Sequence, residues 1–345
     1  MINVDGSQME GGGQLLRMAT TYAGITNNPI RVFNIRGKRR NPGLRPQHLA
    51  TLKAAARLCT GLLKGAKIGS TEIEFHPQRL KCGTHSFDIG TAGSISLMLQ
   101  CLTPLLMFSP KPASLSIRGG TAVKWSPPIP FIQNIVYSAM SVMGADVDIS
   151  IGRHGFYPKG GGEVAVNSRP VNSLSPFQPD PPVINKIKGI SICGSLPSHV
   201  AERQAKSAEK ILARRGLSSD IAVKTVKSSS PGSVIILWTE GSGVFMGSDS
   251  LGDRGKPAEK VGSEAASSLI AQIQSGANVD KHTGDHLVLP CSLADGVSMF
   301  RVSELTMHTL SAIEMAKTFT DCAVDVDGKI GKPARIEIMG IGHVA

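Results

Sequence analysis

The basic segment 36–45, RGKRRNPGLR, holds the side chains best suited to bind a terminal phosphate. Its cations are Arg36, Lys38, Arg39, Arg40 and Arg45. A guanidinium group keeps its charge and matches phosphate oxygens with two parallel hydrogen bonds. A charge run is more often a solvated loop, but the Asn-Pro-Gly turn at 41–43 and a helix start at Pro46 favour a shaped site. The segment therefore predicts an anion site.

Two glycine-rich turns precede predicted helices, GGGQ at 11–14 and GTAGS at 90–94. A helix start has unpaired N–H groups and a positive dipole end, and glycine lets a phosphate approach both. Close packing of helices would account for the glycines equally well. Neither turn has the pattern G-x-x-x-x-G-K-[ST] or G-x-G-x-x-G. A P-loop or Rossmann nucleotide site is therefore not expected.

Composition narrows the class of partner. The net charge of +11 over 345 residues favours a polyanion such as RNA, DNA or nucleotide phosphate. An aromatic content of 4% argues against a broad platform of stacked bases. The six cysteines never form C-x-x-C, which argues against a zinc ribbon or a redox pair. The apolar run 95–108 is interrupted by polar residues and proline, so we expect a soluble, cytoplasmic protein without a membrane partner.

One pattern of helices and strands occurs three times along the chain. Apolar spacing of three and four predicts the helices, and alternation predicts the strands. In the first unit we expect helices at 11–25 and 46–63 and strands at 29–35, 71–77 and 84–89. In the second we expect helices at 93–108 and 130–144 and strands at 113–119, 145–152 and 162–168. In the third we expect helices at 285–296 and 306–320 and strands at 298–304, 322–327 and 334–342.

A segment of different character separates the second and third units. The stretch 168–183 is rich in proline and serine, as a domain boundary should be. Beyond it we expect a strand at 186–193, a helix at 199–216, two or three strands within 221–240 and a helix at 258–276. This βαββα order suggests a thioredoxin-like topology, although Cys193 is its only cysteine and it cannot run a dithiol cycle.

The stretch 153–166, RHGFYPKGGGEVAV, resembles the signature H/R-G-x-x-P-x-G-G-G of the RNA 3'-terminal phosphate cyclase family. Other stretches resemble blocks of that family in the family's order: EGGGQLLR, IRGKRRNPGLRPQHL, IGTAGSISLMLQ, HVAERQA, DHLVLPCSLADG and MHTLSAIEMA. The resemblance implies an α+β fold of three repeated units, each with two helices on a four-stranded sheet, as in enolpyruvyl transferases. It also implies a three-repeat core of residues 1–182 and 278–345 and an inserted smaller α/β domain of residues 183–277.

The chemistry implied by the resemblance is ATP-dependent conversion of an RNA 3'-phosphate into a 2',3'-cyclic phosphodiester, with release of AMP and pyrophosphate. In the family a histidine first binds AMP covalently, and the AMP is then transferred to the RNA. His308 is the matching residue. A lone histidine in a helix is more often a core or capping residue. Here Thr306 or Ser303 can cap the helix, which puts His308 near its first turn, where the dipole favours the neutral imidazole.

The resemblance also implies a nucleotide site. Gln100 matches a glutamine at the nucleotide phosphates, His282 stands where an aromatic ring stacks on adenine, and Pro128 or Pro127 would form the opposite wall. The family's nucleotide loop corresponds to His282, Thr283, Gly284, Asp285 and His286. Glu10 and Asp285 are the expected ligands of Mg²⁺ or Mn²⁺. The spacing H-x-x-x-H also fits zinc, but no cysteine or third ligand is near in sequence.

For the RNA 3'-phosphate the resemblance implies Arg36, Arg39, Gln47 and His48. Two other interpretations remain open. A non-catalytic relative that binds RNA in ribosome assembly would keep the fold without turning over ATP, and a missing histidine nucleophile would mark it. An enolpyruvyl-transferase-like enzyme would act on a small anionic metabolite but lacks the βαββα insertion. The partners expected are therefore ATP and RNA with a 3'-phosphate end, with a homo-oligomer left open.

Overall fold

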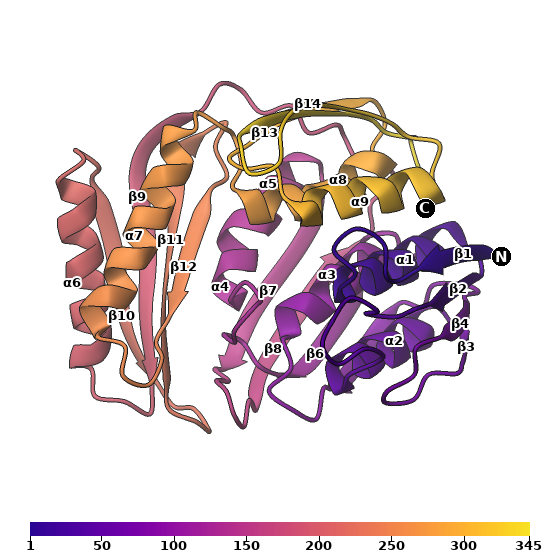
Figure 1. Cartoon of the computed structure of the whole chain (residues 1–345), viewed down its shortest axis with the longest axis horizontal. Helices are drawn as coiled ribbons and strands as arrows, with labels where there is room; N and C mark the ends of the chain where they lie inside the picture. Colours follow the sequence, from indigo (N-terminus) through magenta and orange to yellow (C-terminus); the bar gives the residue numbers. More distant parts are fainter.

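Residues 1–345 are all described by a computed structural model, in which the N-terminal segment forms the first sheet (Figure 1). Its elements are β1 (Ile2–Asp5), α1 (Gly13–Thr26), β2 (Ile30–Phe33), α2 (Pro46–Leu58), β3 (Leu62–Lys64) and β4 (Ile73–His76). The strand order is β1-β2-β4-β3. Strands β1 and β2 are parallel and the other pairs are antiparallel.

The second sheet repeats this order as β5-β6-β8-β7, with β5 and β6 parallel. Its elements are β5 (Gly83–Asp88), α3 (Ile95–Met107), β6 (Ala113–Gly119), α4 (Ile129–Phe131), a wider helical turn η1 (Ile132–Val136), α5 (Tyr137–Val142), β7 (Asp146–Arg153) and β8 (Gly162–Arg169). The expected strand 84–89 is therefore β5, and its assignment to the first unit was wrong. Alternation marks a strand but does not encode its partner, and β1 and β3 are too short to show a period.

The third sheet has three strands in the order β13-β15-β14, all antiparallel, instead of the expected four. Its elements are α8 (Lys281–Leu293), β13 (Val297–Val302), α9 (Met307–Phe319), β14 (Ala323–Gly328) and β15 (Ala334–Met339). In the place of a first strand, Val279 makes a single parallel bridge with Val302. The chain enters α8 two residues later, which leaves no length for a strand.

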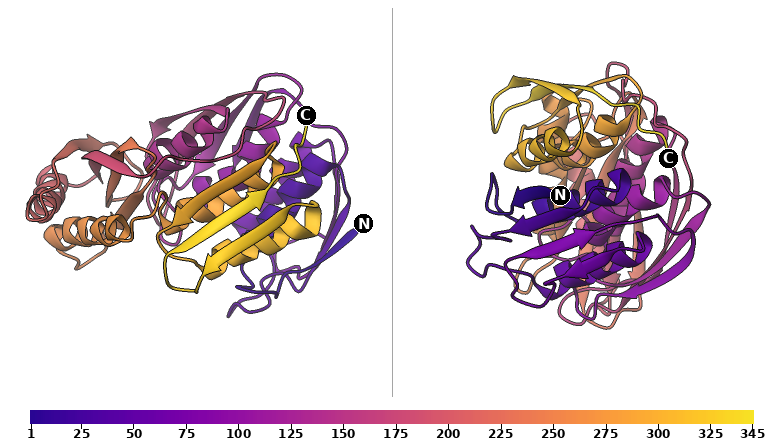
Figure 2. Two further views of the ribbon diagram at one scale, coloured as in Figure 1. Left: turned by 90° about the horizontal axis from the view of Figure 1, so that it is seen from above. Right: turned by 90° about the vertical axis from the view of Figure 1, so that its right-hand side faces the viewer.

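The segment between β8 and α8 forms a separate sheet, β10-β9-β11-β12, which projects to one side of the molecule (Figures 1 and 2). Its elements are β9 (Val183–Gly194), α6 (His199–Ala213), β10 (Ser219–Val226), β11 (Gly232–Ser242), β12 (Gly247–Leu251) and α7 (Ala258–Gln274). Three strands follow α6, the upper number expected, but the third lies at 247–251, beyond the expected 221–240, so the order is βαβββα and the expected βαββα was wrong. β12 escaped prediction because its sequence, GSDSL, has no run of alternating apolar residues.

Helices occupy the interior between the three sheets. α1 contacts both α3 and α9, and α8 contacts α9. Every α1 residue from Gln14 to Ile25 is buried, so this helix lies at the centre of the main core of 73 buried residues. A second core of 15 buried residues lies wholly between Ile187 and Ala277. No helix has the length and apolar character needed to cross a membrane.

Candidate functional site

His308 lies in the first turn of α9, two residues after the N-cap residue Thr306. The Thr306 hydroxyl accepts a hydrogen bond from the Thr309 N–H at 3.0 Å, so one of the two expected caps is confirmed. The side chain of His308 is 47% exposed, so a ligand can reach it. The helix start thus presents an accessible imidazole beside unpaired backbone N–H groups.

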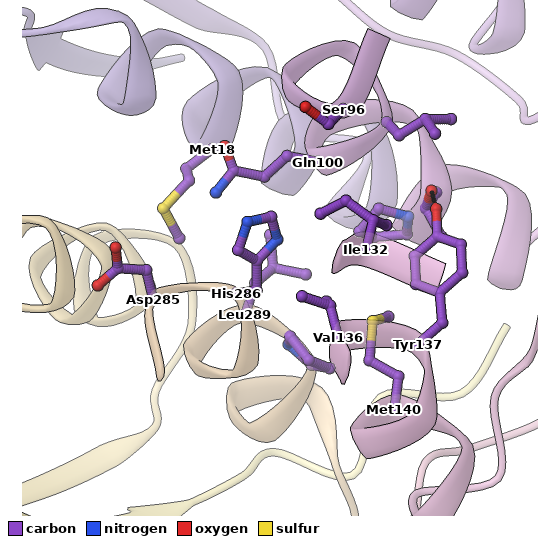
Figure 3. Close-up of a pocket in the computed structure, with 14 residues that line it drawn as sticks. Met18, Ser96, Gln100, Ile132, Val136, Tyr137, Met140, Asp285, His286 and Leu289 are labelled. Carbon is purple, nitrogen blue, oxygen red and sulfur yellow. Dashed lines mark hydrogen bonds between the residues drawn. The ribbon is translucent and has the colours of Figure 1, made fainter. Parts of the chain in front are cut away.

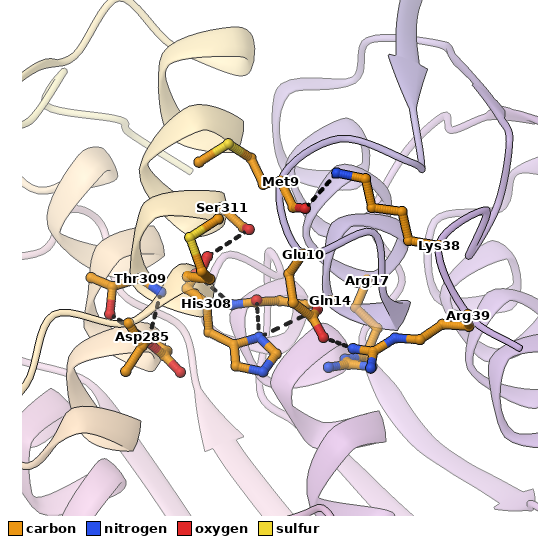
Figure 4. A network of polar contacts seen from close by, with 12 residues as sticks. Met9, Glu10, Gln14, Arg17, Lys38, Arg39, Asp285, His308, Thr309 and Ser311 are labelled. Atoms are coloured by element: carbon orange, nitrogen blue, oxygen red, sulfur yellow. Dashed lines mark hydrogen bonds and ion pairs between the residues drawn. The ribbon is translucent and has the colours of Figure 1, made fainter. Parts of the chain in front are cut away.

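Gln14 of α1 orients the His308 ring (Figure 4). Gln14 Oε1 lies 2.7 Å from His308 Nδ1, and Gln14 Nε2 donates to the His308 carbonyl oxygen at 3.2 Å. Because the amide nitrogen donates to the carbonyl, the amide oxygen faces the ring, and Nδ1 carries the ring proton. Nε2 is then the nitrogen with a free lone pair, which is the form of imidazole that attacks an electrophile.

The surroundings of His308 favour its neutral form. Partial burial is the largest cause that lowers its pKa below the ordinary value of 6.5, and the cations Arg17 and Arg39 lower it further. The Glu10 carboxylate lies 3.6 Å from Nδ1 but already forms an ion pair with Arg39. The positive end of the α9 dipole acts in the same direction as the two arginines. His308 is therefore neutral at pH 7.

The glycines that open α1 allow close approach of side chains from elsewhere. Gly12 is the N-cap and provides no side-chain cap, and a Cβ at this position would collide with Glu10 and Arg39. A Cβ on Gly13 would lie 2.6 Å from His48 Nε2. Only glycine permits this convergence, and it leaves the N–H groups of α1 open to a ligand.

Four helix starts meet around this point. α1 and α9 meet through the amide–imidazole pair, and Gly13 of α1 touches His48 in the first turn of α2. Gln47 Oε1 accepts from the N–H of Ser94, the N-cap of α3, at 3.3 Å. None of the four helices has an acidic residue in its first turn. No acid of their own first turns offsets the positive ends of these helices, which favours an anionic ligand.

Arg17 belongs to this site and was not among the predicted residues. It is 8% exposed, and its Nε donates to Gln100 Oε1 at 3.0 Å, but its terminal nitrogens have no partner in the protein. Burial lowers its pKa to about 10, so it remains charged at neutral pH. A buried arginine without a carboxylate is rare unless a ligand supplies the anion. The available signal was a lone arginine on an otherwise uncharged helix.

The predicted phosphate residues have different surroundings. Arg39 pairs with Glu10, whereas Arg36 Nη1 donates to the carbonyls of Asn41 and Gly43 and so holds its own loop. His48 is 6% exposed, and its Nδ1 accepts from the Arg45 N–H at 3.1 Å.

Burial, with the nearby arginines, lowers the pKa of His48 to about 3, so its ring is neutral and its Nε2–H faces Gly13. Gln47 is half-buried, and its NH₂ group has no partner in the protein. Arg39, Gln47 and His48 therefore lie around the helix starts, and Arg36 supports the loop beside them.

The predicted nucleotide loop forms the first turns of α8. Thr283 is fully buried, and a Cβ on Gly284 would lie 2.6 Å from Val302, so both serve packing of the helix. Asp280, which was not predicted, is the N-cap and accepts from the His282 and Thr283 N–H groups, each at 2.8 Å.

Asp285 Oδ1 accepts from the hydroxyls of Thr306 and Thr309 at 3.0 and 2.7 Å. Burial raises the pKa of Asp285 to about 7. This carboxyl therefore ties the start of α8 to the start of α9.

The proposed walls of an adenine slot lie at two adjacent helix starts. His282 is exposed at the start of α8 and packs edge-on against Phe131, with ring centroids 6.4 Å apart. Pro128 is the N-cap of α4, three residues before Phe131, and is buried, whereas Pro127 is half-buried. The structure therefore brings the His282 and Pro128 segments together.

Gln100, Asp285 and His286 line a small cavity between α1, α3 and α8 (Figure 3). The cavity has a volume of about 30 Å³, which holds a water molecule but not a nucleotide. Burial and the charge of Arg17 lower the pKa of His286 to about 3, so its ring is neutral.

No group of three or more histidine, cysteine, aspartate or glutamate side chains is arranged to hold a metal ion. Glu10 is 16% exposed and Asp285 is 8% exposed. Their hard oxygens suit Mg²⁺, but each stands alone. Such an ion would need phosphate oxygens to complete its coordination.

Comparisons with known proteins agree with the resemblance noted in the sequence. The profile described as RNA 3'-terminal phosphate cyclase matches residues 8–326. Proteins named RNA 3'-terminal phosphate cyclase from Ignicoccus hospitalis and Pyrobaculum aerophilum are each 43% identical to this chain, over 99% of both chains. One of the same name from Pyrococcus abyssi is 42% identical over 98% of this chain and 99% of its own.

Among solved structures, the enolpyruvyl transferase NikO from Streptomyces tendae aligns over 98% of this chain and 81% of its own. The identity is 11% and the TM-score is 0.23, too low to carry an argument about fold or function. The family assignment depends on the sequence matches, which span nearly the whole chain. On that basis, the chain belongs to the RNA 3'-terminal phosphate cyclase family.

Proposed function

We propose that this enzyme converts an RNA 3'-terminal phosphate into a 2',3'-cyclic phosphodiester with ATP, through AMP bound covalently to His308 and then to the RNA. The observation that carries the proposal is the pairing of Gln14 with His308, which leaves Nε2 as a neutral nucleophile at a helix start. The family membership of the chain supports the overall reaction.

In the first step, His308 Nε2 attacks the α-phosphorus of ATP, the N–P bond forms, and the bond to pyrophosphate breaks. The ring gains positive charge while Nδ1 keeps its proton, which Gln14 Oε1 accepts as a hydrogen bond. This hydrogen bond is stronger with the charged ring than with the neutral one, so it stabilises the transition state more than the ground state.

In the second step, an oxygen of the RNA 3'-phosphate attacks the same phosphorus and His308 leaves. The adjacent ribose 2'-OH then attacks the RNA phosphorus, loses its proton to solvent, and expels AMP. The product is the cyclic phosphodiester. Each step exchanges one P–O or P–N bond for another, so no oxidant or reductant is required.

The anionic groups have partners at the helix starts. We assign the RNA 3'-phosphate to Arg39, Gln47 and His48 beside the open start of α1, with Arg36 supporting their loop. Arg17, whose terminal nitrogens are unpaired, is placed to bind a phosphate of either substrate. Charge-assisted hydrogen bonds of this kind are about twice as strong as neutral ones.

We assign the adenine to the region of His282 and Pro128, with the backbone of Thr283 and Gly284 beside it. Gln100 and His286 line the small cavity next to Asp285, where they would support the nucleotide loop. A divalent ion, Mg²⁺ or Mn²⁺, would be held by Glu10 or Asp285 together with ATP phosphates, where it would offset charge on the departing pyrophosphate.

We infer that residues 1–182 and 278–345 form a core of three related units and that residues 183–277 are an inserted domain. The first two sheets share one strand order, and the third lacks only the first strand. The segment 183–277 has its own sheet and its own core. We place the covalent chemistry in the three-unit core.

The decisive experiment incubates the pure protein with ATP and Mg²⁺ without RNA. Intact mass and peptide mapping should then find one AMP on His308, and His308→Ala should remain unmodified. His343→Ala, which removes a histidine on the C-terminal tail, is the matched control and should be modified like the natural sequence. No adduct on a folded protein that binds ATP would reject the mechanism and leave the non-catalytic RNA-binding interpretation.

A further inference from the structure

A cleft of about 1100 Å³ lies between the second unit and the segment 183–277. It is continuous with the candidate site, because Gln47 and the α3 cap residue Ser94 both line it. Its opposite wall includes Arg203 of α6 and residues around Lys256 at the start of α7. The cleft exceeds the size usual for small-molecule pockets, so an extended ligand fits it better than a second nucleotide does.

Two aromatic side chains stand unpartnered in this cleft. Trp125, in the loop between β6 and α4, is 94% exposed, and Tyr157, in the loop between β7 and β8, is 76% exposed. The chain has only two tryptophans and three tyrosines. Exposed aromatic rings forgo a large gain from burial, so a pair of them in one cleft indicates a ligand with flat faces.

The backbone at Trp125 gives an independent indication. Its φ angle is +64°, in the left-handed region that bulky residues rarely adopt. Strain of this kind is retained mainly at sites where a ligand uses the resulting geometry. The adjoining Lys124 pairs with Asp253 of the segment 183–277, so the loop contacts both walls of the cleft.

The charged lining is mostly cationic. Lys124, Arg203, Arg254 and Lys256 line the cleft against a single acid, Asp253. Three of these cations form ion pairs, whereas Arg254 is exposed and has none. A groove with cations and stacking rings is the arrangement that binds single-stranded nucleic acid.

We propose that this cleft binds the single-stranded RNA that precedes the 3'-phosphate, with bases stacked on Trp125 and Tyr157 and a backbone phosphate on Arg254. The proposal rests on the proposed function, since Gln47 would bind the terminal phosphate where the cleft begins. The segment 183–277 then has a role in the reaction, as one wall of the RNA groove. The low aromatic content of the chain is compatible with this role because the two rings are concentrated in one place.

The packing of the signature stretch 153–166 explains its glycines and its aromatic residues. Phe156 packs against Gly194 and Gly232. A Cβ added to Gly194 would lie 2.7 Å from the Phe156 ring, and one added to Gly232 would lie closer to it still. Gly155 and Gly162 contact each other's backbone. The stretch therefore joins the second sheet to the segment 183–277 and holds Tyr157 in the cleft.

The first test uses fluorescence. In Trp238→Phe, Trp125 is the only tryptophan, and titration with a 3'-phosphorylated oligoribonucleotide of about ten residues should quench its emission. A 3'-phosphorylated dinucleotide should quench it much less, since it has only one nucleotide beyond the terminal one to occupy the cleft. Quenching by neither RNA, with binding shown by another method, would overturn the proposal.

The second test uses kinetics of cyclisation. Trp125→Ala should raise KM for the longer RNA roughly 5- to 100-fold, the range for one lost stacking contact, and change KM for the dinucleotide little. Trp125→Phe should restore most of the affinity. Arg254→Gln should also weaken binding of the longer RNA, while Arg215→Gln, an exposed arginine of the same segment outside the cleft, should not.

Formation of the His308 adduct without RNA distinguishes a failure of the RNA groove from a failure of the proposed function. The variants of Trp125 and Arg254 should form it at the natural rate, because neither residue is among those that surround His308. Unchanged KM values for both RNAs in variants that form the adduct would refute the RNA groove alone. Absence of the adduct and of cyclisation in the natural sequence would refute the proposed function, and the fluorescence titration would still report on RNA in the cleft.

Discussion

Gln14 makes two hydrogen bonds to one residue, His308, with its amide oxygen on Nδ1 and its amide nitrogen on the backbone carbonyl. The two residues are 294 positions apart in the chain. This pairing fixes both the ring orientation and the tautomer. It also means that the proposed nucleophile in α9 is oriented by a residue in α1.

Replacing Gln14 should slow adenylation without unfolding the protein. A hydrogen bond to a group that gains charge is worth about 1.5–3 kcal/mol, so Gln14→Ala should lower the rate of adduct formation roughly 10- to 100-fold. ATP binding measured by calorimetry should change little. Gln274→Ala, at the exposed end of α7, is the control. A loss of ATP affinity equal to the loss of rate would assign Gln14 to binding instead of positioning.

Adenylation should depend on the protonation of His308. Only the neutral ring attacks, so the rate should fall as the pH drops through a pKa that lies below 6.5. Arg39 contributes to this lowering and also neutralises Glu10. Arg39→Gln should therefore move the acidic limb of the rate profile to higher pH. An unmoved limb would show that another group controls the profile.

Arg17 should contribute more to ligand binding than to stability. Pyrophosphate should raise the melting temperature of the natural protein, because a ligand at 100 times its Kd stabilises the folded state by about 2.7 kcal/mol. Arg17→Met keeps the apolar stem and removes the charge, so it should abolish most of this shift while leaving the ligand-free protein at least as stable. A preserved pyrophosphate shift would remove Arg17 from the anion site.

Asp249 of β12 should destabilise the folded protein at neutral pH. Burial, aided by the nearby Asp280, raises the pKa of Asp249 to about 7. Because the folded-state pKa is raised, the associated stability is present below the ordinary value of 3.8 and is lost as the pH rises towards 7.

Asp249→Asn should consequently raise the melting temperature at pH 8 by more than at pH 5. Chemical unfolding followed by circular dichroism measures the same difference as a free energy. Asp148→Asn, on the exposed face of β7, is the matched control. Equal effects of Asp249→Asn at both pH values would contradict the raised pKa.

The sequence predicted most elements and the chemical character of the site. Periodicity located the long helices, and the residues around His308 and in the basic segment pointed to phosphate chemistry. Prediction from the sequence failed where the local pattern of residues carries little information. The strand at 84–89 was assigned to the wrong sheet, and β12 was missed because serine and glycine give no apolar alternation.

By itself, the sequence determined the family, the residue types available for phosphate binding and the helix start that carries His308, since these depend on short stretches of chain. Only the tertiary structure decided which groups meet. It put Gln14 on His308, buried Arg17 without a carboxylate, turned Arg36 onto its own loop and placed Trp125 opposite the segment 183–277. These contacts are between residues far apart in the chain, and local sequence patterns do not specify such contacts.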